Sequence, residues 1–416
     1  MRIQLKNSYL FIFLVALVYS MVFVASDWLQ GPLWDDEIGF WRTSLTFSQQ
    51  LIPSFAQIQD YDQFSTPVPF ILFGMLEYLF NLGPFAARMV SFLSSLGIAW
   101  LIGWPGKQGT TKPIFSLLGL FLFPFFLLLS GRLYTDVIAA FLGLVGVVLY
   151  LRDRHISSGV MFVLAIACRQ FMLAFPVAIA AHELARAISG RRWPSLSFFL
   201  PAGAALTIMA WVVLFGGLAP ATATADRWMP SFQSSLFSFS IENGLFFLST
   251  LGWAYVIPEF LYKTFLLKDF KPNLSRSNLI KLLIIAVAVG ILFLLFPPSV
   301  SYLSVFYRVV IRLPSEGWAL AIFASLGILT CWRFARLDLA FSLILFNFLI
   351  MTKAIAWDKY ALPIIVIFWY FQARDIYNRH DFNSFNIYKG DSNIHEHHVS
   401  ESQVKLRIQD SPRKSI

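Results

Sequence analysis

Three consecutive carboxylates, Asp35, Asp36 and Glu37, follow the first long apolar stretch of the sequence. A carboxylate that faces water can accept a proton from an attacking hydroxyl group, so these residues are candidates for general base catalysis. Charged residues make up only 13% of the chain, so such a local concentration of acids needs an explanation. The sequence allows two explanations: a solvated acidic loop beside a membrane, or a carboxylate site at the membrane surface.

The carboxylates lie in a longer acidic segment that runs from Asp27 to Pro67. Asp60 and Asp62 lie near its end, and Arg42 is the one cation within it. In its middle, apolar and polar residues alternate as in a helix that lies in the membrane interface. We expect Trp41 and Phe47 of this helix to face lipid.

The overall composition identifies the class of protein. Hydrophobic residues make up 57% of the 416 residues, above the about 45–50% of a soluble globular protein. Apolar runs recur at about the length that crosses a hydrocarbon layer of ~30 Å. We therefore expect an all-α polytopic membrane protein with about twelve transmembrane helices. The expected spans are residues 9–25, 89–104, 113–130, 137–151, 156–168, 171–186, 195–216, 235–257, 279–297, 317–332, 338–352 and 360–374.

The basic residues predict the orientation of these spans. The net charge is +9, but the cations lie between apolar runs and in the C-terminal tail, as the positive-inside rule predicts for cytoplasmic loops. This pattern does not indicate nucleic-acid binding. We expect both termini to be cytoplasmic and the acidic segment to be external. This assignment requires that residues 68–82 form a short re-entrant or interfacial segment rather than a full crossing.

The same orientation places further polar residues on the external side, at 132–136, 169–170, 225–227 and 353–360. Arg169 and Gln170 interrupt an otherwise continuous apolar stretch. Exposing an arginine to lipid at that depth costs several kcal/mol, so we expect the break to line a watery cavity or to bind an anion. The alternative is a short hairpin tip with a snorkelling arginine.

The chain divides into a membrane domain and a tail. We expect residues 1–376 to form the membrane domain, with residues 26–67 as its external loop, and residues 377–416 to be a disordered cytoplasmic tail. His395, His397 and His398 lie in this tail, where a solvated polar cluster is a better interpretation than a zinc site. Cys168 and Cys331 indicate neither a disulfide framework nor a metal cluster.

The external face therefore combines carboxylates, arginines and aromatic residues. Aromatic faces suit sugar rings, arginine suits phosphate, and a carboxylate can activate a hydroxyl group. Together they suit glycosyl transfer from a lipid phosphate, with inversion at the transferred carbon.

Several local motifs strengthen this interpretation. The sequence resembles the GT-C superfamily of polyprenyl-phosphate-dependent glycosyltransferases, which carry an acidic pair at the start of the first external loop on a scaffold of many spans. It is most similar to one branch, the dolichyl-phosphate-glucose-dependent α-1,2-glucosyltransferases of N-glycan precursor assembly. The matching elements, in the order of that family, are Asp36-Glu37-Ile38-Gly39-Phe40, Tyr61-Asp62, Thr66-Pro67-Val68-Pro69, Cys168-Arg169-Gln170-Phe171, Ala225-Asp226-Arg227 and Asp358-Lys359-Tyr360-Ala361-Leu362-Pro363. The sequence departs from the family pattern at Phe40, at Phe171-Met172 and at Trp228-Met229-Pro230.

The resemblance implies roles for individual residues. Asp36 would be the general base, Glu37 the second candidate, and Asp35 a flanking charge. Arg169 would bind the donor phosphate. The remaining implied substrate-binding residues are Asp62, Asp136, Gln170, Asp226, Arg227, Lys359 and Tyr360.

The resemblance also implies the partners. The donor would be a polyprenyl-phosphate-linked hexose, with glucose favoured, and the acceptor a glycan or a lipid-linked hydroxyl. The reaction would take place on the periplasmic, extracellular or ER-lumenal face. We expect no cofactor; a divalent cation held by the carboxylates is the alternative. A transporter or flippase of a lipid-linked or anionic solute is the competing function, and an inactive scaffold of the same fold is a third.

Overall fold

The computed structural model describes residues 2–105, 111–225, 230–264, 276–299 and 304–378, and within these ranges helices are the only regular secondary structure. The first half contains α1 (Arg2–Ala25), α2 (Asp36–Phe47), α3 (Phe55–Gln59), α4 (Val68–Phe80), α5 (Pro84–Gly103), α6 (Lys112–Phe121), α7 (Pro124–Ser130), α8 (Thr135–Tyr150), α9 (His155–Cys168), η1 (Gln170–Leu173) and α10 (Ala174–Ser189). The second half contains α11 (Leu196–Phe215), α12 (Ala221–Ala225), α13 (Ser231–Ser234), α14 (Ile241–Leu251), the π-helical η2 (Gly252–Val256), α15 (Ile257–Tyr262), α16 (Arg276–Leu295), α17 (Val305–Val310), α18 (Glu316–Arg333), α19 (Leu339–Met351), η4 (Asp358–Ala361), α20 (Leu362–Ala373) and η5 (Ile376–Asn378).

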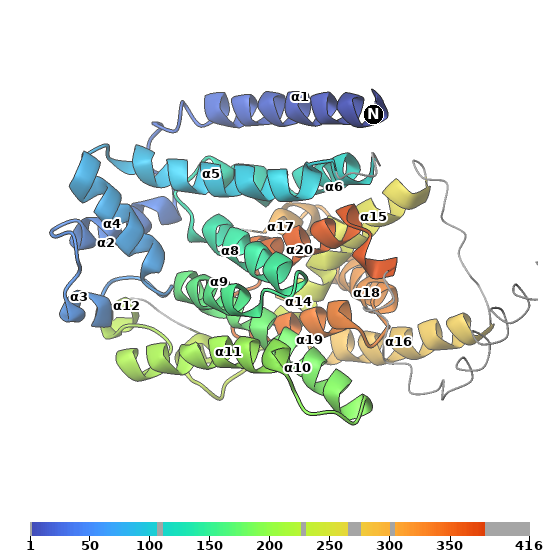
Figure 1. Cartoon of the computed structure of the whole chain (residues 1–416). Coiled ribbons are helices and arrows are strands. Elements are labelled where there is room, and N and C mark those ends of the chain that lie inside the picture. The colour runs from blue at the N-terminus through green and yellow to red at the C-terminus, as the bar shows by residue number, and fades with distance from the viewer. Residues whose placement is uncertain (1, 106–110, 226–229, 265–275, 300–303, 379–416) are drawn as a thin grey trace, which may run out of the picture.

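The long helices form a bundle in which α1 and α16 lie on the outside (Figure 1). α1 and α16 are long enough to cross a membrane, and most of their apolar surface is exposed, which suits lipid as the surrounding solvent. Within the described ranges, six helices meet the length and composition of a span, or seven if the α6–α7 pair, bent by 79°, is counted as one. These helices confirm the all-α, polytopic membrane architecture.

Each of the twelve expected spans overlaps one helix or two or three consecutive helices. Several of these helices are short: α9 has 14 residues and α19 has 13, which correspond to about 20 Å of rise. A helix of this length does not by itself cover a ~30 Å hydrocarbon layer. The number of crossings therefore stays a prediction.

α20 is the centre of the bundle, and all twelve of its residues are buried. Its sequence is apolar on every side, as expected for a helix surrounded by other helices. It packs against α5, α6 and α8. Gly119 of α6 allows the closest approach, since a Cβ there would lie 2.3 Å from the Trp369 ring. Pro363 stands in the first turn of α20, where its missing N–H is tolerated, so η4 is held at the start of the central helix.

The chain leaves α1 and enters α5 at the same end of the bundle, where α2, α3, α4 and α12 also gather (Figure 1). Arg88, near the start of α5, donates to the carbonyl oxygens of Leu29 at 3.2 Å, Gly31 at 2.6 Å and Pro32 at 3.1 Å. These residues follow α1 directly, so the segment between the two helices does not cross the bundle. This agrees with the expectation that residues 68–82 are a short, non-crossing segment.

The orientation of α2 differs in part from the expectation. Phe47 is 1% exposed and packs in the core, so the expectation that it faces lipid is wrong. The reason is the close approach of α4, where a Cβ on Gly74 would lie 2.7 Å from the Ser44 carbonyl oxygen and 2.8 Å from Phe47. Ile38 and Leu45 remain exposed on the other side of α2.

Candidate active site

Asp36 and Lys359 meet although 323 positions separate them in the sequence. Lys359 Nζ lies 2.8 Å from Asp36 Oδ2. The Asp36 side chain is 36% exposed, whereas that of Lys359 is 1% exposed. The first residue of α2 therefore presents a carboxylate to solvent, with a buried ammonium group from η4 behind it.

Aromatic rings enclose the Lys359 ammonium group. Nζ lies 3.3 Å from the centroid of the Trp357 ring, 4.9 Å from that of Tyr134 and 5.6 Å from that of Tyr360. Ring faces attract cations and supply part of the solvation that burial removes. Burial lowers the pKa of Lys359, and the neighbouring Asp136 and Asp36 carboxylates oppose this effect.

A second charge pair lies beside the first. Arg169 Nη2 donates a charge-assisted hydrogen bond to Asp136 Oδ2, and Nη1 donates to Ser65 Oγ at 3.1 Å. Asp136 is fully buried and Arg169 is 8% exposed. The buried, paired position of Arg169 excludes the alternative of a snorkelling hairpin tip.

The pair retains unused hydrogen-bonding capacity. Arg169 Nε and Asp136 Oδ1 are buried, and neither has a hydrogen-bond partner within the described ranges. The rings of Phe171 and Tyr360 lie 5.6 Å and 5.9 Å from the Arg169 guanidinium carbon. The Arg169 guanidinium group is positively charged and only partly hydrogen-bonded, so it is suited to bind an anionic ligand.

Local chain geometry brings these side chains together. α9 ends at Cys168, and the backbone of Arg169 is extended before η1 begins. The break lies against the end of the acidic segment: Gln170 Nε2 donates to the Phe64 carbonyl at 2.5 Å, and Thr66 Oγ1 donates to the Ile166 carbonyl at 2.8 Å. The polar interruption noted in the sequence thus contacts the end of the acidic segment.

The other predicted residues have varied surroundings. Asp35 precedes α2 with a φ of 52°, and its side chain is exposed. The pKa of Asp35 is raised, first by the loss of part of its hydration and second by the negative charge of Asp36. The Asp62 carbonyl accepts a hydrogen bond from Thr43 of α2 at 3.4 Å. Asp226 and Arg227 lie outside the described residues. α12, which precedes them, is bound to the acidic segment, since the Asp60 carboxylate accepts hydrogen bonds from Thr222 N at 2.9 Å and Thr222 Oγ1 at 2.6 Å.

Glu37 lies in a different environment from its neighbour Asp36. It has no exposed surface, and Arg88 binds both of its oxygens, at 2.9 Å through Nε and at 3.0 Å through Nη2. The backbone N–H groups of Leu133 at 2.7 Å and Trp34 at 3.1 Å also donate to it, and Arg132 Nη1 lies 3.8 Å away. Successive residues of a helix point about 100° apart, so one acid faces solvent and the next faces the core. We infer that Glu37 has a structural role.

Arg88 and Arg132 were not among the predicted site residues. One signal for Arg88 was available, because it is the one charged residue within the apolar helix α5, and a buried charge requires a partner. Among the described residues, no group of three or more His, Cys, Asp and Glu side chains is placed to hold a metal ion. The expectation that no metal is needed stays a prediction.

No protein-family model matches the sequence, and no curated protein matches it. The fold is similar to the crystal structure of ArnT from Cupriavidus metallidurans in the apo state, with a TM-score of 0.39 and 15% sequence identity over 88% of this chain and 76% of the ArnT chain. A similarity of this degree does not establish a common family, so the functional argument rests on the residues of the site.

Proposed function

We propose that this protein is a GT-C type membrane glycosyltransferase. It would move a sugar from a polyprenyl-phosphate donor to a hydroxyl group of a glycan or lipid-linked acceptor. The observation that carries the proposal is the part-exposed Asp36 carboxylate backed by buried Lys359, beside the Asp136–Arg169 pair. Glucose is the favoured sugar, because the motifs resemble those of the dolichyl-phosphate-glucose-dependent branch.

The reaction would be a single displacement at C1 of the sugar. The acceptor oxygen attacks C1 and loses its proton to Asp36, and the bond between C1 and the phosphate oxygen breaks with both electrons moving to the phosphate. The products are the glycosylated acceptor and free polyprenyl phosphate, and Asp36 later releases the proton to water. One displacement inverts the configuration at C1.

Lys359 and Arg169 would bind the donor phosphate. Phosphate is a strong partner for ammonium and guanidinium groups in a water-poor site. Both cations already have a carboxylate partner, so the donor phosphate competes with Asp36 for Lys359. Binding of the donor would thus weaken the hold on Asp36 and leave this carboxylate free to act as a base. Because the two cations neutralise the leaving group, we propose no metal requirement.

The competing function, a transporter, is less well supported. Transporters commonly place their binding residues at broken helices near the membrane midplane. Within the described residues, one pair of helices that together have the length and composition of a span is bent sharply, α6 and α7, at 79°. The two residues at that bend are Leu122 and Phe123, which offer no polar group to a solute.

The test uses the full-length protein reconstituted in lipid. Polyprenyl phosphates linked to glucose, mannose, galactose and arabinose are each offered with a membrane extract as acceptor source, and release of free polyprenyl phosphate is measured. We expect release from one donor, and an Asp36→Asn variant to lower turnover by about 10²–10⁴-fold while donor binding is retained.

The matched control is Asp27→Asn, which removes an exposed acid from the same segment and is expected to keep full turnover. Full turnover in the Asp36→Asn variant would remove Asp36 from the base role. Silence from every donor, in protein shown to be folded, would refute glycosyl transfer and favour the transporter.

A further inference from the structure

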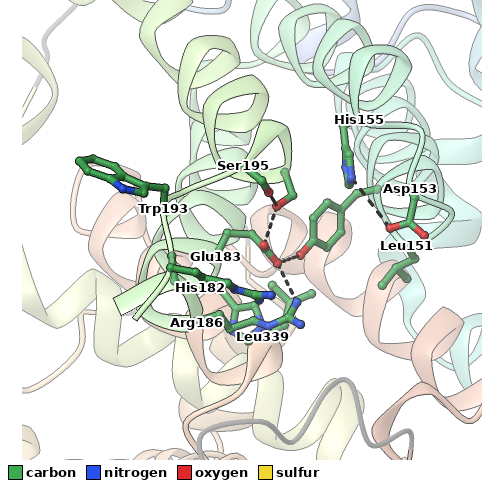
Figure 2. Close-up of a pocket in the computed structure, with 13 residues that line it drawn as sticks. Leu151, Asp153, His155, His182, Glu183, Arg186, Trp193, Ser195 and Leu339 are labelled. Carbon is green, nitrogen blue, oxygen red and sulfur yellow. Dashed lines mark hydrogen bonds and ion pairs between the residues drawn. The ribbon is translucent and has the colours of Figure 1, made fainter. Parts of the chain in front are cut away.

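A second polar site lies far from Asp36. It is a pocket of about 430 Å³ formed by the end of α8, the start of α9, the end of α10 and the connection to α11 (Figure 2). Asp136 stands at the start of α8 and Tyr150 at its end, so the helix axis separates the two sites by about 21 Å. The orientation expected from the sequence places this pocket on the cytoplasmic side.

Glu183 organises the pocket. Its carboxylate accepts hydrogen bonds from Tyr150 Oη at 2.5 Å, Ser197 Oγ at 2.6 Å and Arg186 Nη1 at 3.0 Å (Figure 2). With three donors from three different positions, its negative charge is largely compensated within the protein. Glu183 also fixes the Arg186 guanidinium group at the pocket wall.

Other donors in the pocket remain available. Arg192 lines the pocket, and its side chain makes no hydrogen bond or ion pair with any other residue that the structure describes. His155 Nε2 lies 3.9 Å from Asp153 Oδ1, and its buried Nδ1 has no hydrogen-bond partner within the described ranges. The Asp153 side chain is 95% exposed at the rim. An anion in this pocket would therefore meet two guanidinium groups and an imidazole.

The surroundings of the pocket suit a lipid surface. Trp193, at the rim, is 92% exposed, and the apolar side chains of Ile188 and Leu196 are 69% and 61% exposed. Exposed tryptophan beside basic residues is typical of the boundary between hydrocarbon and water. Basic pockets between transmembrane helices on the cytoplasmic side bind anionic headgroups.

We propose that this pocket binds the phosphate group of an anionic lipid headgroup. The phosphate would be held by Arg186, Arg192 and His155, while Trp193 lies at headgroup level. This inference is independent of the proposed glycosyl transfer, because it uses none of the same residues.

The test measures lipid retention by the purified full-length protein with native mass spectrometry. Phosphatidylglycerol, phosphatidylcholine and inorganic phosphate are offered separately. We expect phosphatidylglycerol to be retained selectively, and an Arg192→Gln variant to weaken its retention by about tenfold or more, because charge-assisted bonds to phosphate are strong. Arg192→Lys, which keeps the charge, should restore most of the retention.

The control is Arg191→Gln, which removes the same charge from the adjacent exposed residue outside the pocket lining. An equal loss in the Arg191→Gln and Arg192→Gln variants would overturn the proposal in favour of diffuse surface charge. Equal retention of the two lipids would also overturn it. If inorganic phosphate alone occupies the site and displaces phosphatidylglycerol, the ligand is a soluble phosphate and not a lipid.

Discussion

Lys359 combines two properties that rarely occur together: it is 1% exposed, and its ammonium group touches a part-exposed carboxylate. Burial favours the neutral amine, whereas the nearby carboxylates favour the charged form. The net direction is a lowered pKa. In the proposed mechanism only the charged form binds the donor phosphate, so the protonation of Lys359 should control donor binding.

The first prediction concerns pH. Because the pKa of Lys359 is lowered, its charge is lost at a lower pH than that of an ordinary lysine. Donor binding should therefore be complete at low pH and weaken as pH rises through this lowered pKa. A Lys359→Arg variant, which keeps its charge to above about pH 12, should move this alkaline loss of binding to higher pH.

Donor affinity measured across pH in both proteins checks this expectation. A Lys359→Met variant should bind the donor about tenfold to a hundredfold more weakly at neutral pH, as expected for loss of a hydrogen bond between charged groups. If donor affinity decreased over the same alkaline pH range in the wild-type protein and in the Lys359→Arg variant, the titrating group would not be Lys359.

At the scale of elements, the acidic segment is held by a few buried polar contacts. The Glu37–Arg88 pair joins α2 to α5, and the same arginine binds the carbonyl groups that follow α1. Breaking a buried ion pair by removing one partner costs about 3–5 kcal/mol, because the other charge is left uncompensated. The position of Asp36 therefore depends on the pair formed by its neighbour.

We accordingly expect Glu37→Gln to destabilise the protein more than Asp36→Asn, which also removes a partner from the buried Lys359 ammonium group. The physical reason is that Glu37 has no exposed surface, whereas Asp36 is 36% exposed. Thermal unfolding of both variants in the same detergent checks this contrast. A normal melting temperature together with lost turnover in Glu37→Gln would instead indicate a chemical role for Glu37.

The same elements show how far the sequence predicts the site. Arg169 was recognisable because a charge that interrupts an apolar run needs a reason. Asp36 was recognisable from the local concentration of acids, and Lys359 only from the motif that resembles the GT-C family. Their mutual contacts were not predictable, because each joins segments separated by tens to hundreds of residues. The different environments of Asp36 and Glu37 were not predictable for a related reason. They depend on which face of α2 is turned toward the core, and this orientation is determined by Arg88 and by the packing of α4.

At the scale of the whole molecule, the two polar sites occupy opposite ends of the bundle. Carboxylates and paired cations gather around the start of α2 and of α8, whereas arginines gather around the end of α8 and of α10. The all-α, multi-span architecture followed from composition and apolar run length. The number of crossings did not, because buried central helices such as α20 are shorter than the hydrocarbon layer and need not face lipid.

Sidedness gives a prediction at this scale. Gln49 and Arg152 are exposed and lie in segments at opposite ends, so Gln49→Cys and Arg152→Cys should be labelled by a membrane-impermeant maleimide from opposite sides of sealed vesicles. The wild-type protein is the control, since Cys168 is buried and Cys331 is partly buried. Labelling of both variants from the same side would contradict the orientation.

The unequal surroundings of the two adjacent acids have a consequence for sequence drift. Under the proposed roles Glu37 serves folding and Asp36 serves chemistry, so we expect the two positions to be under different selective pressures although they are neighbours in the chain. In a duplicated gene released from its original task, the second acid should persist while the first is free to change. Under the proposed roles, an intact glutamate at this position would indicate a shared architecture, and the preceding aspartate would report on activity.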